Sequence, residues 1–237
     1  MSWDAFFTLH RDLPREGPGD RDSLDWSLSQ FDLRHDARIL DAACGPGADV
    51  ADLLAHAPKG HVTALDKQAH FVAAARARFD ADTRVTVQQG DMAEPGGPYD
   101  LIWCAGALYF LGVETGLRGW RRCLTPGGHV VFSEPVLFSA TPSRAAIDFW
   151  ESYPAMQPAG IQAAVHAAGY DVLATAPLSD AAWEAYFGPV DTRIAALRAS
   201  GADEDLAAVL DQAEAEAAFW RAHRSEVGYM MVVARPR

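Results

Sequence analysis

Short apolar runs alternate with amphipathic helical patterns along most of the chain. The expected strands lie near residues 38–43, 61–66, 84–88, 99–105, 127–134, 170–175 and 227–235. Between them, apolar residues recur at the helical period, as in Phe71, Val72, Ala75 and Phe79. Such alternation is typical of a parallel sheet, because neighbouring parallel strands need a crossover connection that is usually a helix. The pattern therefore predicts an α/β fold with a mostly parallel sheet.

The segment before the first expected strand has a different character. Residues 1–37 open with aromatic side chains, pass through a turn-rich stretch and then place Leu24, Leu28 and Phe31 at helical spacing. Ser23 is the expected N-cap of that helix, because its hydroxyl oxygen accepts a hydrogen bond from an early N–H group. We expect residues 1–37 to form a helical cap, which either closes over a ligand as a lid or covers the side of the core.

The regular alternation also stops before the last apolar run. Two alanine-rich helical stretches lie there, at residues 179–200 and 203–224. They predict a helical hairpin, inserted at about residues 179–224 into a main domain that spans residues 38–237. Asp203 is the expected N-cap of the second helix of this hairpin.

Residues 38–50 (RILDAACGPGADV) end an apolar run in an acid and a glycine turn. Gly45 and Gly47 allow backbone conformations closed to other residues and leave no side chain between the loop and a ligand. Asp41, at the end of the strand, favours a ligand with an ammonium or sulfonium group over a pyrophosphate, whose charge it repels. Val50 stands where the nicotinamide-dinucleotide motif needs a third glycine, so the match to that motif is partial.

Three successive expected strands each deliver one aspartate to the same edge of the sheet. Asp41 ends the first strand, Asp66 ends the second and Asp91 follows the third. Ligands of open α/β sheets bind outside the carboxyl ends of the strands, so three carboxylates beside a glycine turn predict a ligand site. The alternative is that each aspartate only caps the helix that follows it.

Composition narrows the classes of partner. The formal net charge is -12, from 32 acidic and 20 basic residues, which disfavours binding to nucleic acid or to anionic membranes. The N-terminal residues lack the basic region and apolar stretch of an export signal, so we expect a cytoplasmic protein. Cys44, Cys104 and Cys123 lack metal-ligand spacing, so we expect reduced cysteines and no metal site.

The glycine turn and the strand-end acids together resemble a class I S-adenosylmethionine (SAM)-dependent methyltransferase. Residues 41–47 (DAACGPG) match the glycine-rich first motif of that family, with Ala43 where a glycine is usual. Asp66 matches the acid that holds the ribose hydroxyls, and the pair Asp91 and Met92 matches the residues at the adenine.

Two later segments extend the resemblance over residues 38–135. Residues 99–106 (YDLIWCAG) are similar to the fourth motif, which lines the methyl-transfer site, and residues 124–130 (LTPGGHV) to the turn into the fifth strand. The resemblance implies a Rossmann-like sheet of seven strands with an antiparallel last strand, helices on both faces and a helical cap. It implies SAM as cofactor and S-adenosyl-L-homocysteine as product. The cofactor-binding residues that it implies are Asp41, Ala43, Cys44, Gly45, Gly47, Asp66, Lys67, Asp91, Met92 and Cys104.

The resemblance leaves the methyl acceptor open. The chain is similar to a bacterial subgroup of small-molecule methyltransferases, in which an acid often stands where this chain has Ala105. The fourth motif also lacks the Pro-Pro segment of enzymes that methylate amide or base nitrogens. We expect methyl transfer to a small organic acceptor through oxygen, nitrogen or sulfur, by a monomer or homodimer. The alternatives are a non-catalytic SAM-binding or partner subunit, and a SAM enzyme with chemistry other than methyl transfer.

Aromatic residues are the candidate walls of the acceptor pocket. The expected pocket residues are Trp103, Tyr109, Trp150, Tyr153 and Trp183. Candidates for a catalytic base are Tyr109, Glu134 and His10, and each has a structural alternative. Glu134 would otherwise be a helix cap or part of an ion pair, His10 a surface residue and Tyr109 part of the lining of the cap.

Overall fold

The computed structural model describes residues 2–150, 153 and 155–237, so Met1 of the predicted cap lies outside the described residues. Its sheet has seven strands in the order β3-β2-β1-β4-β5-β7-β6. The strands are β1 (Arg38–Ala42), β2 (His61–Asp66), β3 (Val85–Gln89), β4 (Tyr99–Cys104), β5 (Leu124–Leu137), β6 (Tyr170–Pro177) and β7 (Val227–Pro236). Strands β3, β2, β1, β4 and β5 pair in parallel, and β7 runs antiparallel between β5 and β6. The predicted fold class is therefore confirmed, antiparallel last strand included.

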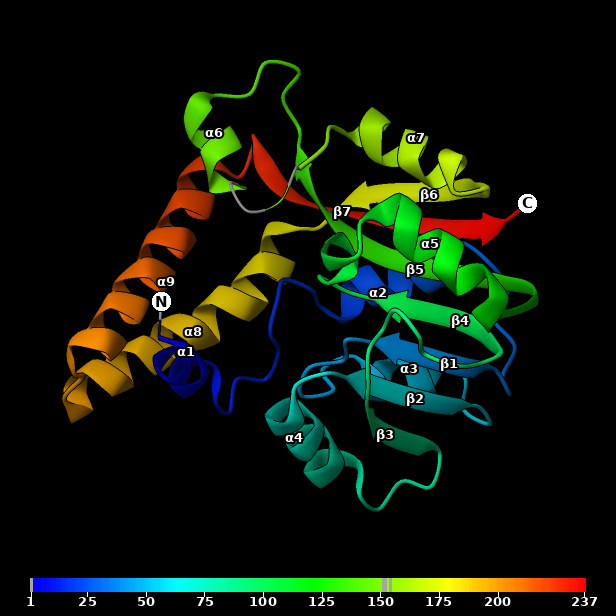
Figure 1. The fold of residues 1–237 in the computed structure, drawn as a ribbon, viewed down its shortest axis with the longest axis horizontal. Coiled ribbons are helices and arrows are strands. Elements are labelled where there is room, and N and C mark those ends of the chain that lie inside the picture. The colour runs from blue at the N-terminus through cyan, green and yellow to red at the C-terminus, as the bar shows by residue number, and fades with distance from the viewer. Residues whose placement is uncertain (1, 151–152, 154) are drawn as a thin grey trace.

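The sheet is covered by helices on both faces (Figure 1). These are α2 (Arg21–Leu28), α3 (Val50–His56), α4 (Ala69–Phe79), α5 (Val113–Trp120) and α7 (Pro158–Ala167), with the short helices η1 (Leu108–Phe110), η2 (Arg121–Cys123) and α6 (Arg144–Phe149). Helices α2 and α3 bury Leu24, Leu28 and Leu53 in one hydrophobic cluster of the sheet. Helices α5 and α7 bury Leu117 and Ile161 in a second cluster, on the other face.

All seven predicted strands are present, and their limits differ most for β5. The prediction for this strand was residues 127–134, whereas β5 spans Leu124–Leu137. Its last residues continue past the end of β4 because they pair with β7, up to Leu137 opposite Val227. No described helix is both long enough and apolar enough to cross a membrane.

The helix caps correct one prediction and confirm another. Helix α2 is capped by Asp20, whose side chain accepts a hydrogen bond from Ser23 N, so the prediction that Ser23 is the N-cap is wrong. Ser23 instead occupies the third helical position and completes a capping box by accepting from the Asp20 backbone N–H. Asp203 caps the second hairpin helix, as predicted, by accepting from Leu206 N.

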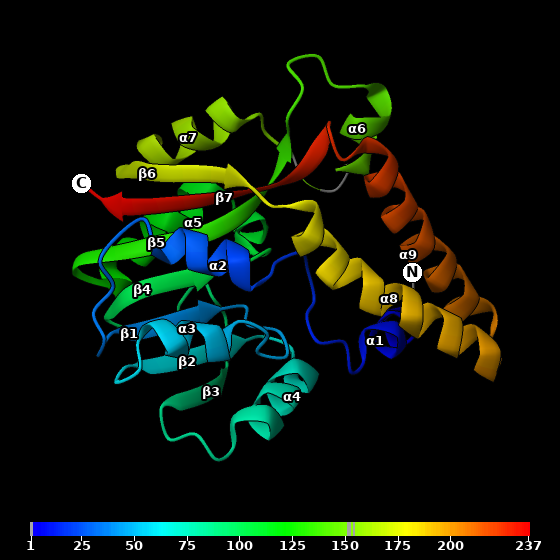
Figure 2. The ribbon, with the colours of Figure 1, turned by 180° about the vertical axis from the view of Figure 1, so that it is seen from behind.

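The N-terminal helix packs on the hairpin rather than on the sheet. Helix α1 (Trp3–His10) lies against α8 (Asp180–Ser200) and α9 (Glu204–His223), beyond the carboxyl ends of the parallel strands (Figures 1 and 2). The residues that form this contact are apolar: Ala5, Leu9, Leu13, Val190, Ile194, Val209 and Leu210. The hairpin and α1 therefore form one helical layer over the edge of the sheet where the three strand-end aspartates lie.

Candidate functional site

The three strand-end aspartates do not serve as helix caps. Helix α3 is preceded by Asp49 and helix α4 by Gln68 at their N-cap positions. Asp66 instead accepts hydrogen bonds from Gly45 N at 2.9 Å and from Gln68 N at 2.8 Å. It therefore ties the glycine turn after β1 to the end of β2, which is a positioning role at the rim of the sheet.

The glycine turn has the backbone conformation that its sequence suggests. Gly45 and Gly47 have φ angles of 54° and 80°, in the left-handed region that favours glycine. A Cβ atom on Gly47 would lie 2.8 Å from Cε2 of Phe79, so a side chain does not fit there. Ala43 also lies in the left-handed region, with φ of 59°, which explains why glycine suits this position better than alanine.

A buried carboxyl group lies beneath the turn. Asp41 is buried, and its Oδ2 has no hydrogen-bond partner among the described residues. Burial raises the pKa of Asp41, the charges of Asp49 and Asp66 raise it further, and Arg15 opposes them. Burial also raises the pKa of Asp66. The backbone N–H groups that donate to its carboxylate have the opposite, smaller effect, because they stabilise its charged form. A cation bound at the turn would lower both pKa values, because it would stabilise the charged carboxylates.

The remaining predicted cofactor residues lie around the same rim. Asp91 is exposed, accepts a hydrogen bond from Ala93 N at 2.9 Å and lies 3.4 Å from Nζ of Lys67. Met92 is half-buried on the second hydrophobic cluster. The Cys104 side chain is fully buried at the end of β4, so only its backbone is placed to meet a ligand. Burial raises the pKa of both Cys44 and Cys104, so neither thiol is activated as a nucleophile.

Part of the predicted N-terminal cap lies across the turn. We call residues 11–20 the strap. Arg15 of the strap forms an ion pair of 2.7 Å with Asp49, and both side chains are 13% exposed. The next residue, Glu16, packs over the glycine turn, because a Cβ atom on Gly45 would lie 3.3 Å from its Cγ.

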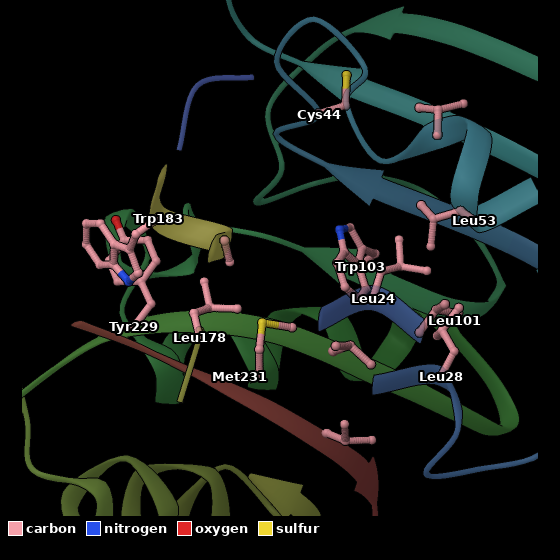
Figure 3. Packing of buried hydrophobic residues seen from close by; sticks show 14 of the residues in the cluster. Leu24, Leu28, Cys44, Leu53, Leu101, Trp103, Leu178, Trp183, Tyr229 and Met231 are labelled. Carbon is pink, nitrogen blue, oxygen red and sulfur yellow. The ribbon is translucent and has the colours of Figure 1, made fainter. Parts of the chain in front are cut away.

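The contacts of Asp49 correct the prediction for Trp103. The indole N–H of Trp103 donates to Asp49 at 2.9 Å, and the residue is only 2% exposed. Figure 3 shows Trp103 inside the hydrophobic cluster, next to Leu24. Trp103 therefore does not line an open pocket; it holds the carboxylate that binds Arg15. A strand in the middle of a parallel sheet is covered on both faces, which buries its side chains.

Aromatic rings gather beyond the end of β4. The centroid of the Tyr109 ring lies 4.4 Å from that of Tyr153 and 6.4 Å from that of Tyr229. Trp150 stacks on Tyr229 at 5.6 Å, so two predicted pocket residues, Tyr109 and Trp150, lie beside Tyr229, which sequence reasoning had not selected. Trp183 is only 3% exposed, and the centroid of its ring lies 5.2 Å from that of Tyr229 in the hydrophobic cluster, so its place in the pocket wall stays a prediction (Figure 3).

The three candidate bases occupy different surroundings. Glu134, on β5, is 5% exposed, and its Oε2 has no partner among the described residues. Burial raises the pKa of Glu134 to about 8. His10 is buried and its Nδ1 lies 2.6 Å from Glu16, so the alternative that made it a surface residue is wrong. Burial raises the pKa of Tyr109, which shares a hydrogen bond with Tyr229.

The structural alternatives for Glu134 are not observed. Glu134 lies within a strand, so it caps no helix, and it forms no ion pair with any residue that the structure describes. Nor do the described residues hold a cluster of three or more His, Cys, Asp or Glu side chains arranged for a metal ion.

Comparison with known proteins identifies the domain. Residues 39–128 match the family described as a methyltransferase domain. Trans-aconitate 2-methyltransferase of Deinococcus radiodurans is 34% identical over 101 residues, which cover 42% of this chain and 38% of that protein. Malonyl-[acyl-carrier protein] O-methyltransferase of Enterobacter lignolyticus is 31% identical over 128 residues, covering 54% of this chain and 48% of that protein. The chain thus spans less than half the length of these two curated relatives.

A solved structure matches over nearly the whole chain. The SAM-dependent methyltransferase of Geobacter sulfurreducens, in complex with S-adenosyl-L-homocysteine, superposes with a TM-score of 0.83 at 21% sequence identity. The match covers 99% of this chain and 98% of that one, so the cap and the hairpin belong to the shared fold. Residues 39–128 therefore match a methyltransferase domain, and the whole chain shares its fold with a SAM-dependent methyltransferase.

Proposed function

We propose that the chain is a SAM-dependent methyltransferase that acts on a small organic acceptor. The observation that carries this proposal is the group of acids around the glycine turn. The Oδ2 atom of Asp41 is buried without a partner among the described residues, and Asp66 fixes the turn through Gly45 N. A cofactor with a sulfonium and an ammonium group fits a site whose buried charge is negative.

The residues around the turn fit the parts of SAM. Asp66 would accept hydrogen bonds from the two ribose hydroxyls, because each carboxylate oxygen has a lone pair left after its bond to the backbone. Asp41 would face the ammonium group, and the bare backbone of Gly45 and Gly47 would allow close approach. Asp91 and Met92 would meet the adenine amine and ring. When bound, SAM supplies a methyl group on a positively charged sulfur.

The chain's own residues would contribute alignment and the exclusion of water. The strap, α1 and the hairpin lie over the carboxyl ends of the strands, where they would cover a bound cofactor and acceptor. The largely apolar faces of the aromatic rings beyond β4, of which Tyr229 is buried and the others half-buried, would form walls for the acceptor. Holding the two reactants in line, away from water, is a large part of what an enzyme can contribute to a displacement at carbon.

The site supports a small acceptor better than a polymer. The formal charge of -12 is unsuited to a nucleic-acid backbone, and helices cover the rim of the sheet. Two methyltransferases named for small or carrier-bound acids match only 42% and 54% of this chain. The acceptor must therefore be inferred from this chain's own cap.

Two measurements test the proposed function. Isothermal titration calorimetry with SAM and with S-adenosyl-L-homocysteine should show binding of both, at one site per chain. Incubation with labelled SAM and a library of small acceptors should then release S-adenosyl-L-homocysteine. No binding of either compound would refute the proposal, whereas binding without turnover across the library would favour the non-catalytic alternative.

We expect the strap to act as a lid, and limited proteolysis tests this role. The strap carries Arg11 and Arg15, and Arg21 follows it, so trypsin has sites along it. Addition of S-adenosyl-L-homocysteine with an acceptor should slow cleavage at these sites, because a lid is held closed by its ligands. Identical cleavage with and without the ligands would show that the strap is a fixed cover.

A further inference from the structure

The strap carries one acid directly over the glycine turn. Glu16 is half-buried, and its stem packs on Gly45, because a Cβ atom on that glycine would lie 3.3 Å from Cγ and 3.7 Å from Cβ of Glu16. Gly45 is also the residue whose backbone N–H donates to Asp66 at 2.9 Å. Glu16 therefore reaches, from the N-terminal cap, the same turn that Asp66 holds from the sheet.

The two carboxylate oxygens of Glu16 have different surroundings. Oε2 lies 2.6 Å from Nδ1 of His10, a buried residue of α1. His10 also lines a small pocket under α1, about 50 Å³ in volume, between this helix, α8 and α9. Oε1 of Glu16 is buried and has no hydrogen-bond partner among the described residues. A buried oxygen of this kind is costly to leave unsatisfied, so it marks a place for a donor from a ligand or from ordered water.

The strap is anchored on both sides of Glu16. On one side, Arg15 pairs with Asp49 at 2.7 Å and donates to the carbonyl oxygen of Gly17 at 3.1 Å. On the other side, the backbone N–H of Gly19 donates to the carbonyl oxygen of Ala182, on α8, at 3.0 Å. These contacts fix the backbone around residue 16, so a change of its carboxylate alone leaves the strap over the turn.

The negative charge of Glu16 is only partly balanced. Among the residues that the structure describes, its ion-pair partner is His10, because the neighbouring Arg15 is bound by Asp49. Burial raises the pKa of Glu16, the hydrogen bond and the charge of His10 oppose this effect, and the charge of Asp66 raises the pKa further. A positively charged donor at Oε1 would therefore stabilise this group of acids more than a neutral donor would.

Only one donor group of SAM is left for Glu16 in the proposed site. The adenine amine would lie at Asp91, which follows β3, and β3 is two strands or about 10 Å away from β1. The ribose hydroxyls would be held by Asp66, whose two oxygens each have a free lone pair. The ammonium group remains, and its three N–H donors allow it to bind both Asp41 and Glu16.

We infer that Glu16 is a further cofactor-binding residue, whose Oε1 accepts a hydrogen bond from the ammonium group in the amino-acid part of SAM. This inference rests on the proposed function and adds a residue of the N-terminal cap to that site. A nucleoside without the amino-acid part would leave Oε1 without its donor. The strap is then more than a cover, because it selects the complete cofactor.

The deaminated analogue of S-adenosyl-L-homocysteine, in which hydrogen replaces the amino group, isolates this contact. Calorimetry on the wild-type protein should show that S-adenosyl-L-homocysteine binds about tenfold or more tightly than the analogue. Glu16→Gln keeps the length of the side chain and its packing on Gly45 but removes the charge, so it should reduce this preference roughly fivefold or more. Asp12→Asn, which removes an equal charge at an exposed position of the strap, is the matched control and should leave the preference unchanged.

The ratio of the two affinities separates recognition of the ammonium group from a structural role. If Glu16 only holds the strap closed, Glu16→Gln weakens the binding of both ligands by the same factor, and the unchanged preference overturns the inference. An equal fall in preference in Asp12→Asn would also overturn it, because a charge anywhere on the strap would then have the same effect. So would a wild-type protein that binds the two ligands equally well.

The same titrations distinguish this inference from the proposed function. If S-adenosyl-L-homocysteine binds the wild-type protein and the preference does not depend on Glu16, only the role of Glu16 is overturned. If S-adenosyl-L-homocysteine does not bind the wild-type protein, the proposed function is overturned, and the inference with it.

Discussion

Replacement of Asp66 by asparagine should weaken SAM binding far more than it weakens the fold. Both oxygens of Asp66 accept backbone N–H groups, from Gly45 and Gln68, and their remaining lone pairs point to the rim. Asparagine keeps one acceptor oxygen and loses the charge. If two charge-assisted hydrogen bonds to the ribose become one neutral hydrogen bond, the free energy of SAM binding weakens by about 2–3 kcal/mol, which lowers the affinity roughly 30-fold to 150-fold.

The effect of Asp66→Asn on stability should be small because two contributions oppose each other. Burial raises the pKa of Asp66 in the folded protein, so its charged form disfavours folding above the unfolded-state pKa, and this penalty grows as the pH rises. Asparagine removes the penalty. It also places an amide N–H group against one of the two backbone donors, which costs about 1–2 kcal/mol. At neutral pH we expect a net change in the free energy of unfolding within about 1 kcal/mol.

The assay combines calorimetry with SAM and thermal unfolding without it. Asp100→Asn is the matched control, since Asp100 accepts from Arg38 N at 2.8 Å and from Thr125 Oγ1 at 2.9 Å at the opposite end of the sheet. It should lower stability and leave SAM affinity unchanged. Equal SAM affinity in Asp66→Asn and wild type, or an equal loss in both variants, would refute the assignment of Asp66 to the ribose.

Three further changes test other parts of the site. Ala43→Gly should leave the free energy of unfolding unchanged or raise it by up to about 1 kcal/mol, because residue 43 has a φ of 59° and glycine adopts that conformation with less strain than alanine. A clearly lower melting temperature of the variant would contradict this. Arg15→Met should lower the free energy of unfolding by about 2–4 kcal/mol and speed hydrogen exchange in the strap, because it breaks a largely buried ion pair. Arg34→Met, which breaks an exposed ion pair, is the control and should lower the free energy of unfolding by less than about 0.5 kcal/mol. Burial raises the pKa of Glu134 to about 8, so its contribution to stability is full below pH 4.5 and is lost as the pH rises through 8. Chemical unfolding at a series of pH values should therefore show a slope of up to about 1.4 kcal/mol per pH unit between about pH 5 and 8, which Glu134→Gln removes.

The parts of the site that sequence could predict are those encoded by short patterns. A strand that ends in an acid and a glycine turn is contained in about a dozen residues, so Asp41, Asp66 and the turn at Gly45 could be recognised one strand at a time. Their meeting at one edge follows from the parallel direction of β1, β2 and β3. The fold class follows from the same alternation of strands and helices.

The contacts that sequence could not predict join residues far apart in the chain. Arg15 pairs with Asp49 across 34 positions, and both residue types are common at the surface, so nothing local marks them as partners. The stretch around Arg15 was predicted to be a turn-rich part of the cap, but its contact with Asp49 was not predicted. Trp103 and Trp183 were expected to line the pocket because they are aromatic, but residue type does not say whether a ring faces a cavity or the core.

The position of Glu16 links two parts of the protein. Its stem packs over Gly45 in the cofactor turn, and its Oε2 lies 2.6 Å from Nδ1 of His10, which lines the pocket under α1. Glu16 therefore joins the strap both to the proposed cofactor site and to the N-terminal helix. Burial raises the pKa of Glu16, so a positively charged cofactor at the turn would stabilise the charged form of this carboxylate. A closed strap and a bound SAM would thus stabilise each other.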